Sequence, residues 1–348
     1  MIITIRNQAT TLERSQLLTI LLQTQAGTQN ISIINIFGQE VIPLNVDTLD
    51  QKLKLLLEAQ SAVENIIESK TPYKFVSRQF QSEDSLITVG NSNNCNQVII
   101  GKVNSPVVIA GPCAVESKQQ LVTTAIEVQK IGATMLRGGA FKPRTSPYQF
   151  QGLGIEGLKL LKTARDKTGL PIVTEVMESG MVEIVAEYAD MLQIGSRNMQ
   201  NYPLLQAVGK QIRPVLLKRG LSSTIDEWLL AAEYIVAAGN PNVVLCERGI
   251  RSFDPQTRNV LDLTAIPLVH QLTHLPIIAD PSHGTGRSDL VPIMARASIA
   301  AGANGLILEV HPEPNNALCD GKQSLNFDQL RTVIHETQLL TTMFQTVE

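Results

Sequence analysis

From Val107 onward, eight short runs of apolar, largely β-branched residues alternate with stretches of helical periodicity. The runs are VVIAGP, ATMLRGG, PIVTEV, MLQIGS, PVLLKRG, NVVLCERG, PIIADPS and GLILEV. Between them lie stretches such as EGLKLLKTARDKTG, in which apolar residues recur every three or four positions. Strands that alternate with helices form parallel sheets, and eight such units favour a closed (β/α)8 TIM barrel over an open, doubly wound sheet. We predict this α/β barrel over residues 105–348.

The first 70 residues predict a separate, smaller unit. MIITI has the pattern of a strand and TLERSQLLTILLQTQ that of a helix, and ISIINI and EVIPL flank FGQ as a hairpin. TLDQKLKLLLEA then predicts a second helix and VENIIES a last strand. The order βαββαβ is typical of a ferredoxin-like α+β domain. We place this domain at residues 1–70 and a polar connector at residues 71–104.

Composition excludes several classes of protein. Among 348 residues, 43% are hydrophobic and 18% charged, and the net charge is −3, which excludes a globally basic nucleic-acid binder. No apolar run approaches the roughly 20 residues that span a bilayer, and the N-terminus has no signal-peptide pattern, so we expect no membrane partner. Four cysteines without a CxxC pair predict neither a disulfide framework nor structural zinc. We expect a cytoplasmic protein.

Polar residues mark the ends of the predicted strands. In chain order these residues are Cys113, Arg137, Glu175, Arg197, Lys218, Arg248, Asp280 with His283, and Glu309. The carboxyl ends of barrel strands open onto one face, and the stiff loop FKPRTSPYQFQG adds Lys142 and Arg144 to it. Converging cations repel one another, and salt bridges to barrel carboxylates could neutralise only one or two of them. The cluster therefore predicts a ligand with several negative charges, such as phosphate esters and a carboxylate.

A second group of residues has the chemistry of a metal site. Its members lie at or just past strand ends, in GPCAVES, DPSHGTG, LILEVHP and ALCDGKQS, and are Cys113, His283, Glu309 and Asp320. Each alone could be structural, but one thiolate, one imidazole and two carboxylates together suit Mn, Fe, Co or Zn better than Mg or Ca. His311 is a competing ligand or a donor behind the ligands.

These motifs, in this order, resemble the 3-deoxy-D-arabino-heptulosonate-7-phosphate (DAHP) synthases, which begin the shikimate pathway of aromatic amino acid biosynthesis. The resemblance rests on GPCAVES, LRGGAFKPRTSPYQFQG, QIGSRNMQN, LLKRG, CERGIRSF, DPSHGTGR and EVHPEP...ALCDGKQSL, and it begins at PYKFVSRQF in the connector. The whole chain is similar to the short microbial subtype, type I beta, which carries an N-terminal ferredoxin-like domain and usually forms tetramers. In relatives this domain binds aromatic amino acids, so the resemblance implies tyrosine or phenylalanine as a feedback effector.

The resemblance implies a metal-dependent, aldol-type condensation of phosphoenolpyruvate with erythrose 4-phosphate and water. It assigns phosphoenolpyruvate to Arg137, Lys142, Arg197, Lys218 and Arg248, and erythrose 4-phosphate to Arg144, Thr145 and Ser146. One divalent metal on Cys113, His283, Glu309 and Asp320 would polarise the aldehyde. We expect Lys142 to be the general acid, with a water on the metal as the alternative, so the catalytic residues are Lys142, Cys113 and His283.

Two other functions remain open at this stage. The 3-deoxy-D-manno-octulosonate-8-phosphate synthases share the barrel and the metal set, but they carry Asn-Arg-Ser where this chain has KPRTSP, and they normally lack the N-terminal domain. A non-catalytic regulatory homologue would be expected to have lost a ligand or a cation, and none is missing. One departure from the family is HGTG after the strand, where Ser-Gly is expected. Finally, Cys319 precedes Asp320, and in a closed barrel oxidation could link it to Cys113.

Overall fold

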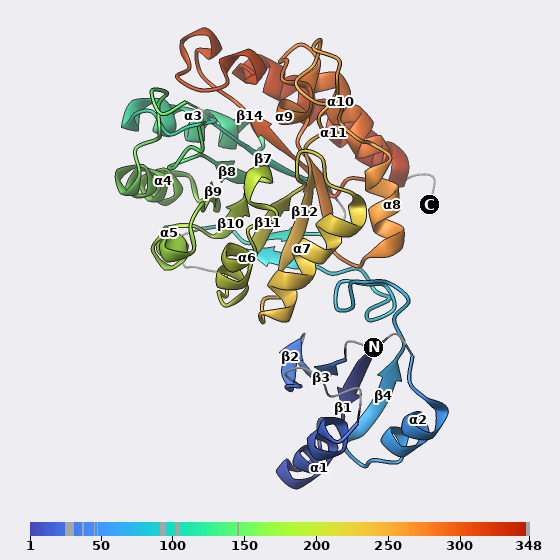
Figure 1. The fold of residues 1–348 in the computed structure, drawn as a ribbon. Helices are drawn as coiled ribbons and strands as arrows, with labels where there is room; N and C mark the ends of the chain where they lie inside the picture. Colours follow the sequence, from blue (N-terminus) through green and yellow to red (C-terminus); the bar gives the residue numbers. More distant parts are fainter. Residues whose placement is uncertain are drawn as a thin grey trace.

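Eight parallel strands form a closed barrel, as the alternating pattern predicts (Figure 1). The computed structural model describes residues 1–24, 31–36, 38–44, 46, 48–90, 95–101, 105–144 and 146–345. The strands follow one another around the barrel in chain order, and the last pairs with the first from Gly305↔Val107 to Glu309↔Gly111. They are β7 Val107–Gly111, β8 Met135–Arg137, β9 Ile172–Glu175, β10 Met191–Ile194, β11 Val215–Lys218, β12 Val243–Glu247, β13 Ile277–Ala279 and β14 Gly305–Glu309.

Helices follow each barrel strand and cover the outside of the barrel (Figure 1). They are α3 Lys118–Ile131, α4 Ile155–Thr168, α5 Val182–Tyr188, α6 Tyr202–Gly209, α7 Ile225–Ala237, α8 Ala265–Leu272, α9 Pro281–Thr285, α10 Val291–Ala300 and α11 Phe327–Gln345. Local sequence sets their ends: α7 begins with a capping box between Thr224 and Glu227, and α4 ends where Gly169 takes φ 72°. No described helix is both long enough and apolar enough to cross a membrane.

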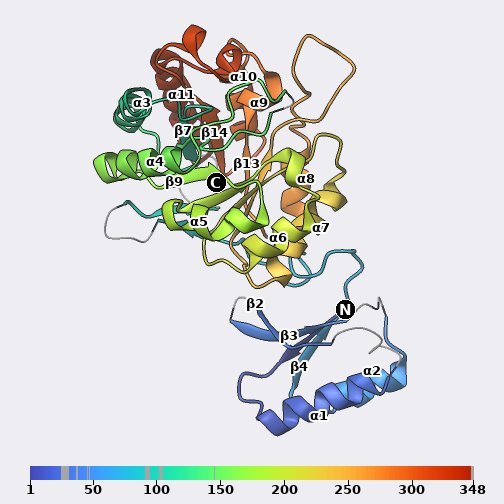
Figure 2. The same ribbon diagram turned by 60° about the vertical axis from the view of Figure 1, so that its left-hand side comes forward.

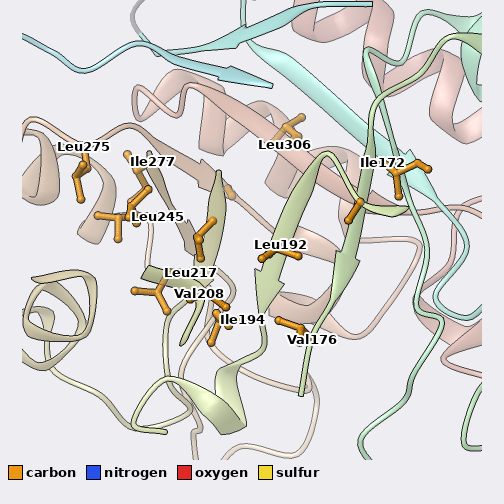
Figure 3. Packing of buried hydrophobic residues seen from close by; sticks show 14 of the residues in the cluster. Ile172, Val176, Leu192, Ile194, Val208, Leu217, Leu245, Leu275, Ile277 and Leu306 are labelled. Atoms are coloured by element: carbon orange, nitrogen blue, oxygen red, sulfur yellow. The ribbon is translucent and has the colours of Figure 1, made fainter. Parts of the chain in front are cut away.

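The alternation of side chains along the strands creates two hydrophobic layers. One cluster fills the barrel interior and includes Val173, Leu216 and Ile307. Their neighbours in sequence, such as Ile172 and Leu217, point outward into a larger cluster beneath the helices, part of which Figure 3 shows. Successive side chains of a strand point to opposite faces of the sheet. The residue two positions after the last interior residue of a strand therefore also points inward, and at the carboxyl end it faces the mouth of the barrel.

The N-terminal part forms a four-stranded antiparallel sheet with two helices, as expected for a ferredoxin-like fold. Its elements are β1 Ile2–Ile5, α1 Thr11–Leu22, β2 Ile34–Ile36, β3 Gln39–Pro43, α2 Gln51–Glu58 and β4 Val63–Ile67, in the sheet order β2-β3-β1-β4. Figures 1 and 2 both show this unit beneath the barrel, at the end remote from α9, which follows the carboxyl end of β13. Ile2, Ile36 and Val41 belong to the same buried cluster as the outer layer of the barrel.

The connector contains a hairpin that the sequence pattern does not predict. Its strands are β5 Ile87–Val89 and β6 Val98–Ile100, which pair in an antiparallel sheet. Ile87, Val89 and Ile100 are buried in the interior cluster of the barrel, so the hairpin closes the amino end of the barrel. Earlier in the connector, the backbone N–H groups of residues 74–76 all donate to the Glu233 carboxylate on α7, at 2.9–3.0 Å. The connector is therefore anchored to the barrel at two places.

Candidate active site

The carboxyl ends of the strands carry charged and polar side chains that face inward. Each lies two positions after a residue of the barrel interior and so points the same way. They are Arg137, Glu175, Gln193, Lys218, Arg248, Asp280 and Glu309. Beside them lies a cavity of about 450 Å³ at the mouth of the barrel. The cations that line it include all six that the sequence analysis expects to converge: Arg137, Lys142, Arg144, Arg197, Lys218 and Arg248. Ser146 is not among the lining residues, and Thr145 lies outside the described residues.

Arg137 and Lys142 are two buried members of this cation cluster, and both contact Cys113. The Arg137 guanidinium donates to Glu309 Oε1 at 2.6 Å and to the carbonyl oxygen of Cys113 at 3.3 Å. Lys142 Nζ lies 3.0 Å from the same carbonyl and 3.1 Å from Cys113 Sγ. Gly139 leaves room for the lysine, because a Cβ at that position would lie 2.7 Å from Lys142 Cδ. Both cations therefore line the cavity and also contact predicted metal ligands.

A chain of hydrogen bonds orients His283. Asp280 Oδ2 accepts from Lys218 Nζ and lies 2.8 Å from His283 Nδ1, while Asp280 Oδ1 accepts the backbone N–H of His283 at 2.9 Å. Burial would raise the pKa of Asp280, but its hydrogen bonds with His283 and Lys218 and the charge of Lys218 hold it well below its ordinary value. Burial lowers the pKa of His283, so the imidazole is neutral at pH 7. With its proton on Nδ1, the ring presents the Nε2 lone pair to the remaining residues.

Glu309 and Asp320 lie near that lone pair, and Cys113, the remaining predicted metal ligand, is joined to them through Asp320. His283 Nε2 lies 3.4 Å from Glu309 Oε1 and 4.0 Å from Asp320 Oδ2. Cys113 Sγ lies 3.5 Å from Asp320 Oδ2. Asp320 thus belongs to two groups of three, Cys113, Cys319 and Asp320 and His283, Glu309 and Asp320, and within each group the ligand atoms lie within 4.8 Å of one another. One sulfur, one imidazole and two carboxylates fit a divalent transition metal.

The protonation states also fit a metal site. Burial would raise the pKa of Glu309, but His283, Arg137 and Lys142 together lower it, so the carboxylate is charged. Burial also raises the pKa of Cys113 well above its ordinary value, and the hydrogen bond with Cys319 adds to this. The thiol therefore keeps its proton until a cation displaces it.

Comparison with known proteins identifies the family. The sequence profile of the DAHP synthetase I family matches residues 79–346. The chain belongs to this family. It is 50% identical over 283 residues to phospho-2-dehydro-3-deoxyheptonate aldolase of Thermotoga maritima, an alignment that spans 81% of this chain and 82% of the relative. A crystal structure of phospho-2-dehydro-3-deoxyheptonate aldolase (DAHP synthase) from Thermotoga maritima superposes with a TM-score of 0.76 at 42% identity, covering 99% of this chain and 97% of that one.

Other relatives carry the name of the alternative enzyme. A 2-dehydro-3-deoxyphosphooctonate aldolase of Syntrophotalea carbinolica is 35% identical over 251 residues, which cover 67% of this chain and 90% of the relative. A similar protein of Rhodopseudomonas palustris is 34% identical over 254 residues. These identities are lower than the 50% shared with the Thermotoga protein.

Two further arginines of this DAHP synthetase family member line the cavity, and the sequence analysis does not predict either of them. Arg251 and Arg258 line the cavity from the loop after β12. Arg258 Nη1 lies 3.2 Å from Asp320 Oδ2 and 2.8 Å from Gln323 Oε1, and Gln323 Nε2 in turn donates to Glu309 Oε2 at 2.7 Å. Arg258 thus contacts one carboxylate of the metal group directly and the other through Gln323. The only sequence signal for Arg251 is its place in CERGIRSF, and Arg258 has none.

The HGTG turn, in which the chain departs from the expected Ser-Gly, lets this loop approach the site. The backbone N–H of Arg258 donates to the Thr285 carbonyl at 2.9 Å, and Asn259 Nδ2 donates to the His283 carbonyl at 2.8 Å. Gly286 has φ 70°, and a Cβ there would lie 2.5 Å from Arg258 Cβ. A glycine is required at this position for both reasons.

Cys319 lies as close to Cys113 as the sequence analysis expects. The two Sγ atoms are 2.9 Å apart, and both thiols are buried. A redox role for the pair stays a prediction. We expect hydrogen peroxide to inactivate the enzyme by linking the two sulfurs, and Cys319→Ser to slow the inactivation without changing initial activity by more than about twofold. Assay of residual activity over time checks this, with Cys95→Ser as the control. Equal rates of inactivation in the wild type and Cys319→Ser would refute the redox role.

Proposed function

We propose that this chain condenses phosphoenolpyruvate with erythrose 4-phosphate and water to give 3-deoxy-D-arabino-heptulosonate 7-phosphate and phosphate, the first step of the shikimate pathway. The observation that carries the proposal is one cavity lined by eight cations together with His283 and Asp320, in which Arg137 and Lys142 also contact Glu309 and Cys113. Two phosphates and a carboxylate are the anions that such a cluster requires. Family membership and the 50% identical aldolase support this choice.

Phosphoenolpyruvate is proposed to occupy the deep part of the cavity. The cations assigned to it are Arg137, Lys142, Arg197, Lys218 and Arg248, which line the cavity. Arg137 and Lys218 are each held by a buried carboxylate, Glu309 and Asp280 respectively, so their positions are fixed before the substrate binds. Fixed charges need no reorganisation when an anion arrives, which favours both binding and the developing charge of the reaction.

Erythrose 4-phosphate is proposed to bind at the KPRTS loop, with its phosphate on Arg144, Thr145 and Ser146. Arg144 Nε donates to the Phe150 carbonyl at 3.1 Å, which holds the guanidinium at the cavity wall. The aldehyde would then point inward, toward Lys142 and the ligands Cys113, His283, Glu309 and Asp320. Bound there, a divalent metal (Mn, Fe, Co or Zn) would supply Lewis acidity to the aldehyde oxygen.

In the proposed reaction, C3 of phosphoenolpyruvate forms a bond with the aldehyde carbon, and the carbonyl electron pair moves to oxygen. Lys142 gives its proton to that oxygen. Water then adds to C2, and the bond from C2 to the phosphate oxygen breaks, which leaves a ketone at C2; of the two protons of the water, one leaves with phosphate and the other restores Lys142. Residues 137 and 142 therefore stabilise negative charge where it develops, while Lys218 and Arg248 hold the substrate anions.

The test of this function compares two aldehydes in one assay. Phosphate release from phosphoenolpyruvate should be fast with erythrose 4-phosphate, slow or absent with arabinose 5-phosphate, and lost when a chelator is added. Preference for arabinose 5-phosphate would instead establish the octulosonate synthase as the function, and no release with either sugar would establish a non-catalytic homologue.

Substitution of Arg144 should affect one substrate. In Arg144→Gln, loss of charge-assisted bonds worth about 1.5–3 kcal/mol should raise KM for erythrose 4-phosphate roughly 10- to 150-fold. KM for phosphoenolpyruvate should change by less than about twofold. The matched control is Arg287→Gln, which removes an exposed arginine that pairs with Asp289 outside the cavity. Equal rises in both KM values would place Arg144 in the phosphoenolpyruvate site instead.

For residues 1–70 we propose a regulatory role, with tyrosine or phenylalanine as the effector, in a cytoplasmic homotetramer. The unit lies beneath the barrel of its own chain, so it can cover a cavity mouth only in a second copy (Figure 2). Pro72 lies between β4 and the residues that bind Glu233, so a chain that begins there keeps the connector anchored. We expect this truncation to stay active and to lose inhibition. If millimolar tyrosine and phenylalanine leave the full-length enzyme unaffected, the unit is an oligomerisation element.

A further inference from the structure

The loop that carries Asp320 is held by a pair of side chains outside the cavity. Glu116 follows Cys113 by three residues and precedes α3, whereas His311 follows β14. Among the described residues, neither belongs to the lining of the cavity, and both are largely buried, with side-chain exposures of 11% and 7%. A substrate in the cavity would therefore not touch them, and they have no role in the proposed reaction.

Their hydrogen bonds converge on the segment just before the metal ligand. Glu116 Oε1 accepts the backbone N–H of Leu318 at 2.9 Å, and Glu116 Oε2 lies 3.3 Å from His311 Nε2. His311 Nδ1 accepts the backbone N–H of Glu313 at 3.0 Å, which places the ring proton on Nε2, where it can be donated to Glu116. The pair thus binds the 313–318 segment at both ends.

The backbone at Asp320 needs such support. Asp320 has φ 51° and ψ 33°, and it is the only described residue other than glycine with a positive φ. A left-handed conformation of a residue with a side chain costs about 1 kcal/mol or more and persists only where neighbouring structure imposes it. The anchor at Leu318 is two residues away, and it also fixes Cys319 beside Cys113.

We propose that Glu116 and His311 are positioning residues that act as one clamp: by fixing Leu318 and Glu313 they hold Asp320 in place as a metal ligand. The proposal rests on the proposed metal site. The sequence leaves open whether His311 is a metal ligand or a donor behind the ligands, and the clamp assigns it the second role. Its Nε2 faces Glu116, and His311 belongs to neither ligand group.

Metal affinity of the apo protein tests the clamp. Co²⁺ is titrated into full-length wild type, Glu116→Gln, His311→Gln and the double variant, in competition with a chromophoric chelator. Each single variant should raise Kd about 10- to 100-fold, the usual cost of losing a partner behind a metal ligand. Because one clamp is broken in either case, the double variant should be no weaker than the worse single variant.

The control and the contrary outcomes are distinct. Glu127→Gln removes a carboxylate from α3 that pairs with exposed Lys130, and it should leave Kd within twofold of wild type. Thermal melting of each apo variant confirms that it is folded. Kd values within twofold of wild type in both single variants, or effects that add in the double variant, would overturn the clamp. Failure of the wild type to bind Co²⁺ would instead overturn the metal site itself.

Discussion

A Cys113→Ala variant should bind Co²⁺ at least about 100-fold more weakly than wild type, since loss of a ligand costs more than loss of a partner behind it. Turnover should fall by a similar or larger factor. In the proposed ligand set, Cys113 would supply the sulfur, and the other members, His283, Glu309 and Asp320, offer only nitrogen and oxygen. Soft thiolate ligands select the transition metals, so the variant should also discriminate less against Mg²⁺.

The measurement is a metal titration followed by an activity assay of the same samples. Chelation should abolish turnover in wild type, and Mn, Co or Zn should restore it. Cys246→Ala is the matched control, because Cys246 is an equally buried thiol in the interior layer of the barrel. A metal-stripped Cys113→Ala protein that retains full activity would rule out the metal assignment.

The same titration has an expected pH dependence. Protons compete with the metal for His283 Nε2, and burial holds the pKa of His283 below its ordinary value of 6.5. Because the pKa of Cys113 is raised, its thiol also gives up a proton when a metal binds, so lowering the pH from about 8 to 6.5 should weaken Co²⁺ binding about tenfold per pH unit, with little further loss from His283.

The sequence predicts the barrel and most of the cavity for one physical reason. In a parallel barrel, the residues at the carboxyl ends of all strands lie at the same end of the barrel, so they can be located from the sequence. Arg137, Lys218 and Glu309 each lie two residues after an interior residue, namely Met135, Leu216 and Ile307. Their convergence therefore follows from the two-residue period of a strand. The ferredoxin-like unit is predictable for a similar reason, because its elements are local and regularly spaced.

What escapes prediction depends on contacts between loops. Arg258 lies ten residues after Arg248, and its contact with Asp320 exists only because glycines at 284 and 286 let two loops approach each other. The pairing of Glu116 with Leu318 likewise joins segments 202 residues apart. The β5–β6 hairpin is short, and its apolar residues become informative only once the amino end of the barrel is known to need closing.

Substitution of Lys142 should have the other large effect. In Lys142→Met, kcat should fall by about 10²- to 10⁴-fold, the usual contribution of a positioned general acid. Burial would lower the pKa of Lys142, but interactions with Cys113 and Cys319 raise it above its ordinary value. The amine is then protonated at neutral pH, and it transfers its proton only to a strong base, such as the alkoxide that forms as the new carbon–carbon bond closes.

Two further variants separate proton transfer from binding. Lys142→Arg keeps the charge but is a far weaker acid, so it should retain KM for phosphoenolpyruvate within about tenfold while kcat stays low. Gly139→Ala leaves the amine in place but adds a Cβ 2.7 Å from Lys142 Cδ, so it should lower kcat by displacing the lysine. The control is Lys118→Met, which removes an exposed lysine outside the cavity. If Lys142→Arg restores kcat to near wild type, the lysine serves only as a charge, and the proton must come from another donor.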